Sequence, residues 1–185
     1  MAIIDSATVN KKVISQDAYE VGEVQDIRYD PATWNIEGLK LRCSKTVSSM
    51  ISAGTSKSMI MLGPVQFSMN DVIVLPDDIE GANSYIRADS DNFSAVSYLM
   101  GRKVISADGA TIGAVESVLI DLDDWSLNSL RVKLDKTAYE RLGIKKGLIF
   151  GKTVSGLLVN LIEAVTENII LNVTADELKD IVIQD

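Results

Sequence analysis

The stretch Lys12-Val-Ile-Ser-Gln-Asp17 occurs a second time, 91 residues later, as Lys103-Val-Ile-Ser-Ala-Asp108. At the same spacing seven further pairs are identical: Gly22 and Gly113, Val24 and Val115, Asp30 and Asp121, Trp34 and Trp125, Leu39 and Leu130, Lys45 and Lys136, and Thr46 and Thr137. Residues 12–46 match the second copy at 12 of 35 positions without a gap, and the match aligns the only two tryptophans. Such self-similarity at a fixed period indicates an internal duplication, so we expect two copies of one structural unit.

The length and charge of the chain limit the number of structural units and the kinds of partner that it can have. Its 185 residues suit two units of roughly 80 to 90 residues each. The formal net charge is −8, with 13 acidic and 8 basic residues in positions 1–91 and 13 and 10 in positions 92–185. Because neither half is basic, we expect neither nucleic acid nor an anionic lipid surface as a partner.

The cysteine content and the lack of targeting signals indicate where in the cell the protein is located. Cys43 is the only cysteine, so no intramolecular disulfide can form. The second copy has the apolar Leu134 at the position of Cys43, which favours a thiol that packs in the core over a reactive one. No apolar run approaches the roughly 18 residues that a membrane span needs. The first residues lack the basic start and apolar stretch of a signal peptide. We therefore expect a cytoplasmic protein without direct membrane insertion.

Short β-strands dominate both copies. Val13-Ile14 and Val104-Ile105 each begin a strand, and a polar turn follows each of them. The next strand contains Gly22 or Gly113 and lacks a clean one-sided alternation, which predicts a bend or bulge near the glycine. Four later strands are expected in each copy. In the first copy they lie at 36–41, 58–62, 65–67 and 72–75, and in the second at 127–134, 147–150, 162–164 and 169–171. The last two pairs align at an offset of 97 residues.

Helices are expected at four places. Asp135 to Gly143 has an N-capping acid, good helix formers and a terminal glycine, and residues 46–54 have the same size. Asp91 to Met100 has apolar residues at helical spacing and is stopped by glycine. Thr174 to Glu177 is a capping box before an apolar helical face. Residues 76–90 are interpreted as a charged segment that links the two repeats.

These patterns predict a mainly β protein. The expected architecture is two tandem small β-barrels, each with a short helix, joined by a helical linker and followed by a C-terminal helix. The expected boundaries are residues 8–80 for the first repeat, 81–100 for the linker with its helix, and 101–185 for the second repeat.

The sequence contains no complete catalytic or metal-binding motif. The sequence has no histidine, which removes the commonest general base and metal ligand. The run from Gly147 to Thr153 has three residues between its glycines where a phosphate loop needs four. The run from Asp121 to Asp124 lacks the later ligands of a calcium loop and is read as a turn. We therefore expect no enzymatic activity, no metal and no cofactor.

Two apolar sets are candidate partner surfaces, and both could equally fill a core. Methionines concentrate in the first repeat, and methionine adapts to irregular contacts at interfaces as well as in cores. The second set lies on the expected linker helix, whose apolar stripe could face a barrel or another subunit. The candidate interface residues are Met50, Met59, Met61, Phe93, Val96, Tyr98 and Met100.

The repeat resembles the PRC-barrel family. The run Gly101-Arg-Lys-Val-Ile-Ser-Ala-Asp-Gly-Ala-Thr-Ile-Gly113, followed by Val115, Val118 and Asp121, carries the resemblance. The first copy follows the same pattern over residues 12–30, except that Ala18 replaces the turn glycine found at Gly109. The resemblance covers both halves of the chain.

The resemblance implies a small, strongly bent barrel used as an assembly module. Tandem acidic copies are most similar to archaeal PRC-barrel proteins that act as adaptors in FtsZ-based cell division with the membrane anchor SepF. It therefore implies a non-enzymatic adaptor, a homo- or heterodimer whose partner is a SepF-like division protein or another PRC-barrel protein at the division site. The alternatives are a ribosome-maturation factor like RimM, whose RNA-facing domain has no counterpart here, and a sensor that holds a small ligand or metal between the barrels.

Overall fold

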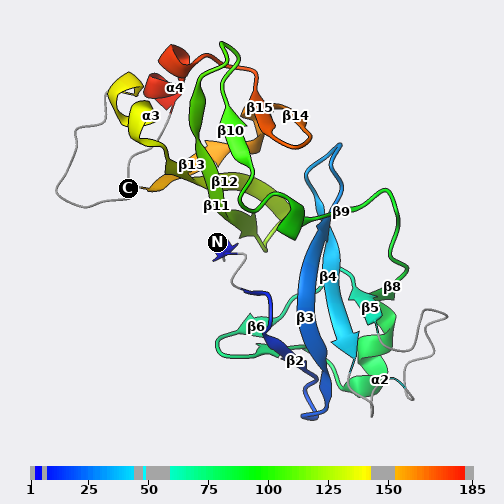
Figure 1. Cartoon of the computed structure of the whole chain (residues 1–185). Helices are drawn as coiled ribbons and strands as arrows, with labels where there is room; N and C mark the ends of the chain where they lie inside the picture. The colour runs from blue at the N-terminus through cyan, green and yellow to red at the C-terminus, as the bar shows by residue number, and fades with distance from the viewer. Residues whose placement is uncertain (1–2, 6–7, 44–47, 49–58, 143–152, 182–185) are drawn as a thin grey trace. The chain divides into compact units, whose positions relative to one another are not determined.

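The computed structural model of the chain describes residues 3–5, 8–43, 48, 59–142 and 153–181 (Figure 1). It is mainly β, with two sheets and few helices. The chain divides into two compact units, the first made of residues 1–97 with 121–126 and the second of residues 98–120 with 127–185. The expected boundaries at 8–80, 81–100 and 101–185 stay a prediction.

The first unit is built around one long antiparallel pair, β3 and β4, which Figure 1 shows side by side. Its strands are β2 (Lys12–Ile14), β3 (Glu20–Tyr29), β4 (Ile36–Cys43), β5 (Met59–Leu62), β6 (Ser68–Met69), β7 (Ile73–Val74), β8 (Ile86–Arg87) and β9 (Ser94–Ala95). They form a sheet of order β6-β7-β2-β3-β4-β5-β8, and β9 pairs with β3. Helix α2 (Ile79–Ala82) and the 3-10 turns η2 (Asn83–Tyr85) and η3 (Val96–Tyr98) complete the elements up to the unit boundary.

The second unit repeats this arrangement. Its strands are β10 (Lys103–Ile105), β11 (Thr111–Asp121), β12 (Ser126–Leu134), β13 (Thr153–Leu158), β14 (Ile162–Val165) and β15 (Ile169–Leu171). The helices are α3 (Lys136–Arg141) and α4 (Ala175–Ile181), with the 3-10 turn η4 (Val159–Leu161) before β14. Along the sheet the order β14-β15-β10-β11-β12-β13 is the order β6-β7-β2-β3-β4-β5 of the first unit.

The registers of the two sheets also agree. Val13 lies opposite Gly22 in the first unit, and Val104 lies opposite Gly113 in the second. Each of these valines also has a parallel partner, Ile73 for Val13 and Ile169 for Val104. The last strands therefore align at an offset of 96. The expected offset of 97 was wrong by one residue, and the observed offset aligns the buried pairs Ile73 with Ile169 and Leu75 with Leu171.

Gly22 and Gly113 mark the point where the long strands approach most closely. A Cβ at Gly22 would lie 2.5 Å from the Arg42 carbonyl oxygen, and one at Gly113 would lie 2.1 Å from the Lys133 carbonyl oxygen. The neighbouring strand has a register shift at the same place, between Val13 and Ile14 and between their counterparts. The predicted bulge beside the glycine is confirmed in both units, and it lets the sheet bend sharply.

A serine and an aspartate join the turn after the first strand of each sheet repeat, β2 or β10, to a helix later in the same unit. The Ser15 hydroxyl donates to Asp17 at 2.5 Å, and the same Asp17 oxygen accepts from the backbone N–H of Ile79, where α2 begins. The second unit repeats both bonds at 2.6 and 3.1 Å between Ser106, Asp108 and Ala175, where α4 begins. A strand turn thus satisfies a free N–H at a helix start in each unit, and we call this arrangement the turn–helix lock.

The shared Asp and Trp residues shape the hairpin turn after the longest strand. Asp30 accepts from the N–H of Ala32, and Asp121 accepts from the N–H of Asp123, both at 2.9 Å. Trp34 and its counterpart Trp125 have φ values of 62° and 54° and so reverse the chain in the left-handed region. The identity of these pairs is explained by one turn conformation used twice.

The core of each unit lies against the bent sheet at matching positions. The fully buried side chains of the first unit include Val13, Val24, Ile27, Leu39, Leu41, Leu62 and Ile73. Their counterparts Val104, Val115, Val118, Leu130, Val132, Leu157 and Ile169 are buried in the second. In the described part of the chain neither sheet closes on itself, so the expected barrels are not confirmed.

Several expected elements changed. The helix predicted at Asp91 to Met100 was wrong, and so was the helical linker: this segment forms β9 and η3, because its backbone pairs with β3. The segment 76–90, expected as a charged link between the repeats, contains helix α2 and strand β8, and β8 belongs to the first sheet. The C-terminal helix is confirmed as α4, and the Thr174–Glu177 capping box is formed. Of the helix expected at 46–54 only Ser48 is described, and it is helical, while the strand expected at 147–150 lies outside the described residues.

Candidate functional site

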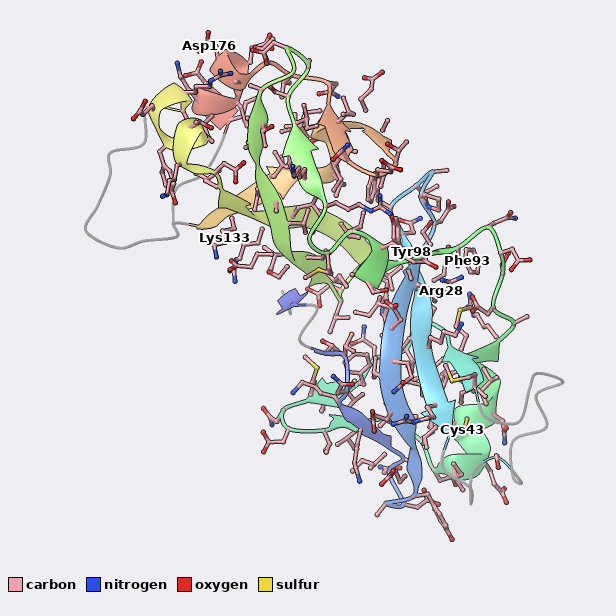
Figure 2. All side chains as sticks on the ribbon, in the orientation of Figure 1. Arg28, Cys43, Phe93, Tyr98, Lys133 and Asp176 are labelled. Atoms are coloured by element: carbon pink, nitrogen blue, oxygen red, sulfur yellow. The ribbon has the colours of Figure 1, made fainter. Side chains whose placement is uncertain are left out.

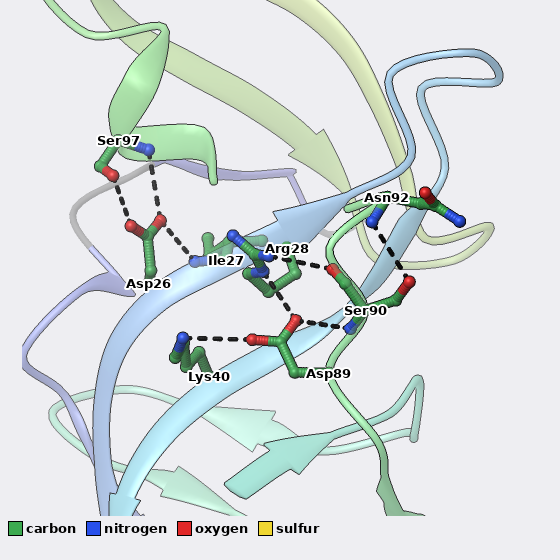
Figure 3. Close-up of polar contacts among 8 residues, drawn as sticks. All are labelled: Asp26, Ile27, Arg28, Lys40, Asp89, Ser90, Asn92 and Ser97. Atoms are coloured by element: carbon green, nitrogen blue, oxygen red, sulfur yellow. Dashed lines mark hydrogen bonds and ion pairs between the residues drawn. The ribbon is translucent and has the colours of Figure 1, made fainter. Parts of the chain in front are cut away.

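The first unit holds an extended segment of the chain on its sheet, and this is the best-built binding arrangement in the described residues (Figure 3). The bound segment is residues 89–97, called here the connector, which runs from β8 toward the second unit. The receiving surface, called the connector dock, consists of Asp26, Arg28 and Tyr29 on β3 and Lys40 on β4.

Backbone pairing gives the connector its direction. Strand β9 runs antiparallel to β3, with Ala95 opposite Arg28 and Ser94 opposite Tyr29. This pairing uses the end of β3 beyond its contact with β2, which covers only Glu20 to Glu23. Ala95 is buried, so a small side chain fills the position against the sheet. The connector is therefore bound as an added strand, a mode in which main-chain hydrogen bonds supply affinity and side chains supply specificity.

Two basic side chains bind the start of the connector. Arg28 Nε lies 3.0 Å from one Asp89 carboxylate oxygen, and Lys40 Nζ lies 3.1 Å from the other. Arg28 also donates through Nη2 to the carbonyl oxygen of Ser90 at 3.3 Å. Partial burial opposes ionisation of Asp89, but the hydrogen bonds and charges of Lys40 and Arg28 outweigh it, so the pKa of this carboxyl lies below its ordinary value.

Asp26 binds the other end of the connector. One of its carboxylate oxygens accepts from the N–H of Ser97 at 3.2 Å and from the N–H of Ile27 at 2.8 Å. The second oxygen accepts from the Ser97 hydroxyl. A register shift in β3 lies between Val24 and Asp26, immediately before the aspartate. Such bulges commonly re-aim a side chain, and this one precedes the carboxylate that meets the connector.

The connector dock thus binds three features at fixed positions along an extended segment. It accepts a carboxylate at one end, a small residue in the middle and a hydroxyl with its backbone N–H at the other end. These are recognition contacts, since charge-assisted hydrogen bonds at fixed spacing favour one register over others. The described residues contain no group of three or more His, Cys, Asp or Glu side chains arranged to hold a metal ion.

The structure places the predicted interface residues in different environments. Met61 is 2 % exposed on β5 and Val96 is 2 % exposed at the start of η3. Met59, Phe93 and Met100 are half-buried. Tyr98 is 64 % exposed, the most of any large hydrophobic side chain in the described residues, and Figure 2 labels it together with Phe93. Met50 lies outside the described residues.

The prediction did not single out Asp26, Arg28, Lys40 or Asp89. A comparison of the two copies carries a signal for the first two, because Ser117 and Leu119 stand at their equivalents in the second copy. Charges that are private to one copy of a duplicated scaffold mark where the copies differ. The partner Asp89 lies in the connector, outside the repeat, so no internal comparison could have identified it.

Cys43 is half-buried at the end of β4, opposite Gly22. Burial raises the pKa of its thiol, which agrees with the packed thiol expected from the sequence.

None of the helices in the described residues has the length and apolar character needed to cross a membrane.

Comparisons with known proteins give a likeness to solved structures only. No protein-family model matches the chain, and no curated protein is similar to it in sequence. Among solved structures, the chain is similar to a protein from Pseudomonas aeruginosa titled as a 16S ribosomal RNA processing protein, RimM. The two are 14% identical, the alignment covers 83% of this chain and 99% of that one, and the TM-score is 0.31.

Proposed function

We propose that this chain is a non-enzymatic adaptor that binds other proteins through its β-sheets. The connector dock is the observation that carries the proposal. A sheet that already holds an extended segment by strand pairing, with polar anchors at both ends, has the features of a strand-addition site. The net charge of −8 disfavours nucleic acid as the partner and so favours a protein.

Each unit is proposed to be a small barrel of the PRC type. The duplicated strand order, the close approach at Gly22 and Gly113 and the paired bulges support strong bending of both sheets. The turn–helix lock supports this further, because it ties the helix that follows β7 or β15 back to an early turn of the same unit. Two such units in one chain offer two separate surfaces, which is what an adaptor requires.

The partner class is proposed from the family resemblance. It would be a SepF-like division protein or another PRC-barrel protein, with dimers formed by this chain, at the division site in the cytoplasm. Purified partner candidates, mixed with this protein and followed by light scattering on a sizing column, test this assignment. Elution of every mixture as the separate components would contradict it.

Affinity purification from the native host, followed by mass spectrometry, tests adaptor function in general. The proposed interface centres on the exposed Tyr98, and the other predicted interface residues are Met50, Met59, Met61, Phe93, Val96 and Met100. Tyr98→Ala should lose proteins that the unchanged chain recovers. Tyr19→Ala is the matched control, since Tyr19 is also an exposed tyrosine, at 41 %. Equal recovery by both variants would exclude the Tyr98 surface as the interface.

A further inference from the structure

We propose that the connector is a displaceable internal ligand of the first unit, and that the connector dock also accepts an extended acidic segment from a partner protein in its place. This inference rests on the proposed adaptor function and names the site and the partner chemistry for it. The occupant is specified by what the dock already holds. It is a strand with an aspartate, then a small residue opposite Arg28, then a serine near its end.

The contacts of the connector are of a kind that a second chain can reproduce. Its named polar contacts with β3 and β4 are made by Asp89, Ser90 and Ser97, and none of them depends on the connector being part of the same chain. The two ion pairs of Asp89 are partly exposed, with the Asp89 side chain 31 % exposed, Lys40 35 % exposed and Arg28 13 % exposed. Ion pairs near the surface are individually weak and can be exchanged, but Asp89 forms two of them, so their joint loss should change affinity by about tenfold.

The charge of the dock selects the partner. Arg28 and Lys40 together place two positive charges around one carboxylate of the connector. When the connector leaves, both cations lose that carboxylate, so the vacated strand position favours an incoming acidic residue over a neutral one. The Asp26 carboxylate at the other end rejects a second acidic residue and favours a hydroxyl and N–H donor. The two ends together fix the direction of the incoming strand.

Covalent connection gives the connector an advantage that a partner must overcome. A tethered segment has an effective concentration on the order of millimolar, so a free segment of equal intrinsic affinity competes poorly. The observed affinity of a partner therefore depends on the fraction of molecules with an open dock, and weakening the connector raises that fraction. The same residue change thus has opposite effects on the internal and external ligands.

The test is binding of a fluorescent peptide with the sequence of residues 87–98 to the full-length protein, measured by anisotropy. Asp89→Asn in the protein weakens the connector but leaves the dock intact, so peptide affinity should rise by about tenfold. Adding Arg28→Ala to this variant removes an anchor of the dock and should abolish the gain. Asp176→Asn is the matched control, because Asp176 forms an exposed ion pair with Lys179 in α4 of the second unit.

A change in the peptide keeps the test independent of how the variants fold. A peptide with Asp89→Asn should bind the opened protein more weakly than the native peptide, by about tenfold, since it lacks the carboxylate. Equal binding of both peptides, or no gain for Asp89→Asn over Asp176→Asn, would overturn the proposal. That failure would leave the adaptor function standing if affinity purification still returns partners that depend on Tyr98, so the two proposals fail separately.

Discussion

Replacing Gly113 by alanine is predicted to break the second unit at its tightest point. The new Cβ would lie 2.1 Å from the Lys133 carbonyl oxygen and 2.9 Å from the Leu134 Cα. Both neighbours are backbone atoms, so no side-chain rotation can relieve the overlap. An ordinary carbon–oxygen contact needs about 3.2 to 3.5 Å, so strands β11 and β12 must separate by roughly 1 Å. Overpacking of this kind costs about 2–3 kcal/mol.

The assay is thermal unfolding by calorimetry, together with urea unfolding to check that the m-value is unchanged. A loss of about 2–3 kcal/mol should lower the Tm of the affected unit by about 8–24 °C. Gly22→Ala, with its Cβ 2.5 Å from the Arg42 oxygen, should act in the same direction on the first unit.

Gly109→Ala separates the steric effect from the conformational one. Gly109 has a φ of 82°, but a Cβ there meets no atom within 4 Å. Its replacement should therefore cost only the left-handed strain, about 1 kcal/mol after the gain from a stiffer unfolded chain. If Gly113→Ala destabilises the protein no more than Gly109→Ala, the close approach of the strands is not what requires glycine, and the argument fails.

Three further predictions concern single residues. Ala18 has a φ of 67° where the second copy has Gly109, so Ala18→Gly should leave the Tm unchanged or raise it slightly, and a clear fall would contradict the shared turn. The Ser106 hydroxyl and the Ala175 N–H lower the pKa of Asp108 from 3.8, so its contribution to stability is present above that value and is lost as the pH falls through the folded-state pKa. Asp108→Asn should therefore lower the Tm at pH 7 and flatten its decline in acid, and an unchanged acid profile would argue against the lock. Because burial raises the pKa of Cys43, Ellman's reagent should modify it more slowly than a free cysteine at pH 8 and at the normal rate in urea, whereas equally fast reaction without urea would contradict its burial.

The duplication predicted the topology of the chain well, because identical residues at Gly22 and Gly113 meet identical backbone demands. The capping box at Thr174 was predictable for a similar reason, since all its contacts lie within four residues of sequence. The turn–helix lock was not, because it joins Asp17 to Ile79 and Asp108 to Ala175 across the whole unit. Nothing in a local pattern specifies such a contact.

The connector shows most clearly where a local pattern misleads. Phe93, Val96 and Met100 have the spacing of a helical face, and the segment forms a strand and a 3-10 turn instead. Pairing with β3 supplies backbone hydrogen bonds that compete with those of an isolated helix, and a ten-residue helix is marginal by itself. Tertiary contacts therefore override the propensity of this segment, and the dock that provides them could not be predicted from the connector alone.

The central claim is that the first unit binds residues 89–97 as an added strand held by Arg28 and Asp26. Amide hydrogen exchange of the peptide covering this segment, compared between the unchanged protein and Arg28→Ala, tests it most directly. We predict measurable protection in the unchanged protein and faster exchange in the variant, with exchange of the second unit unaffected. Equal exchange of the segment in both proteins would contradict the claim.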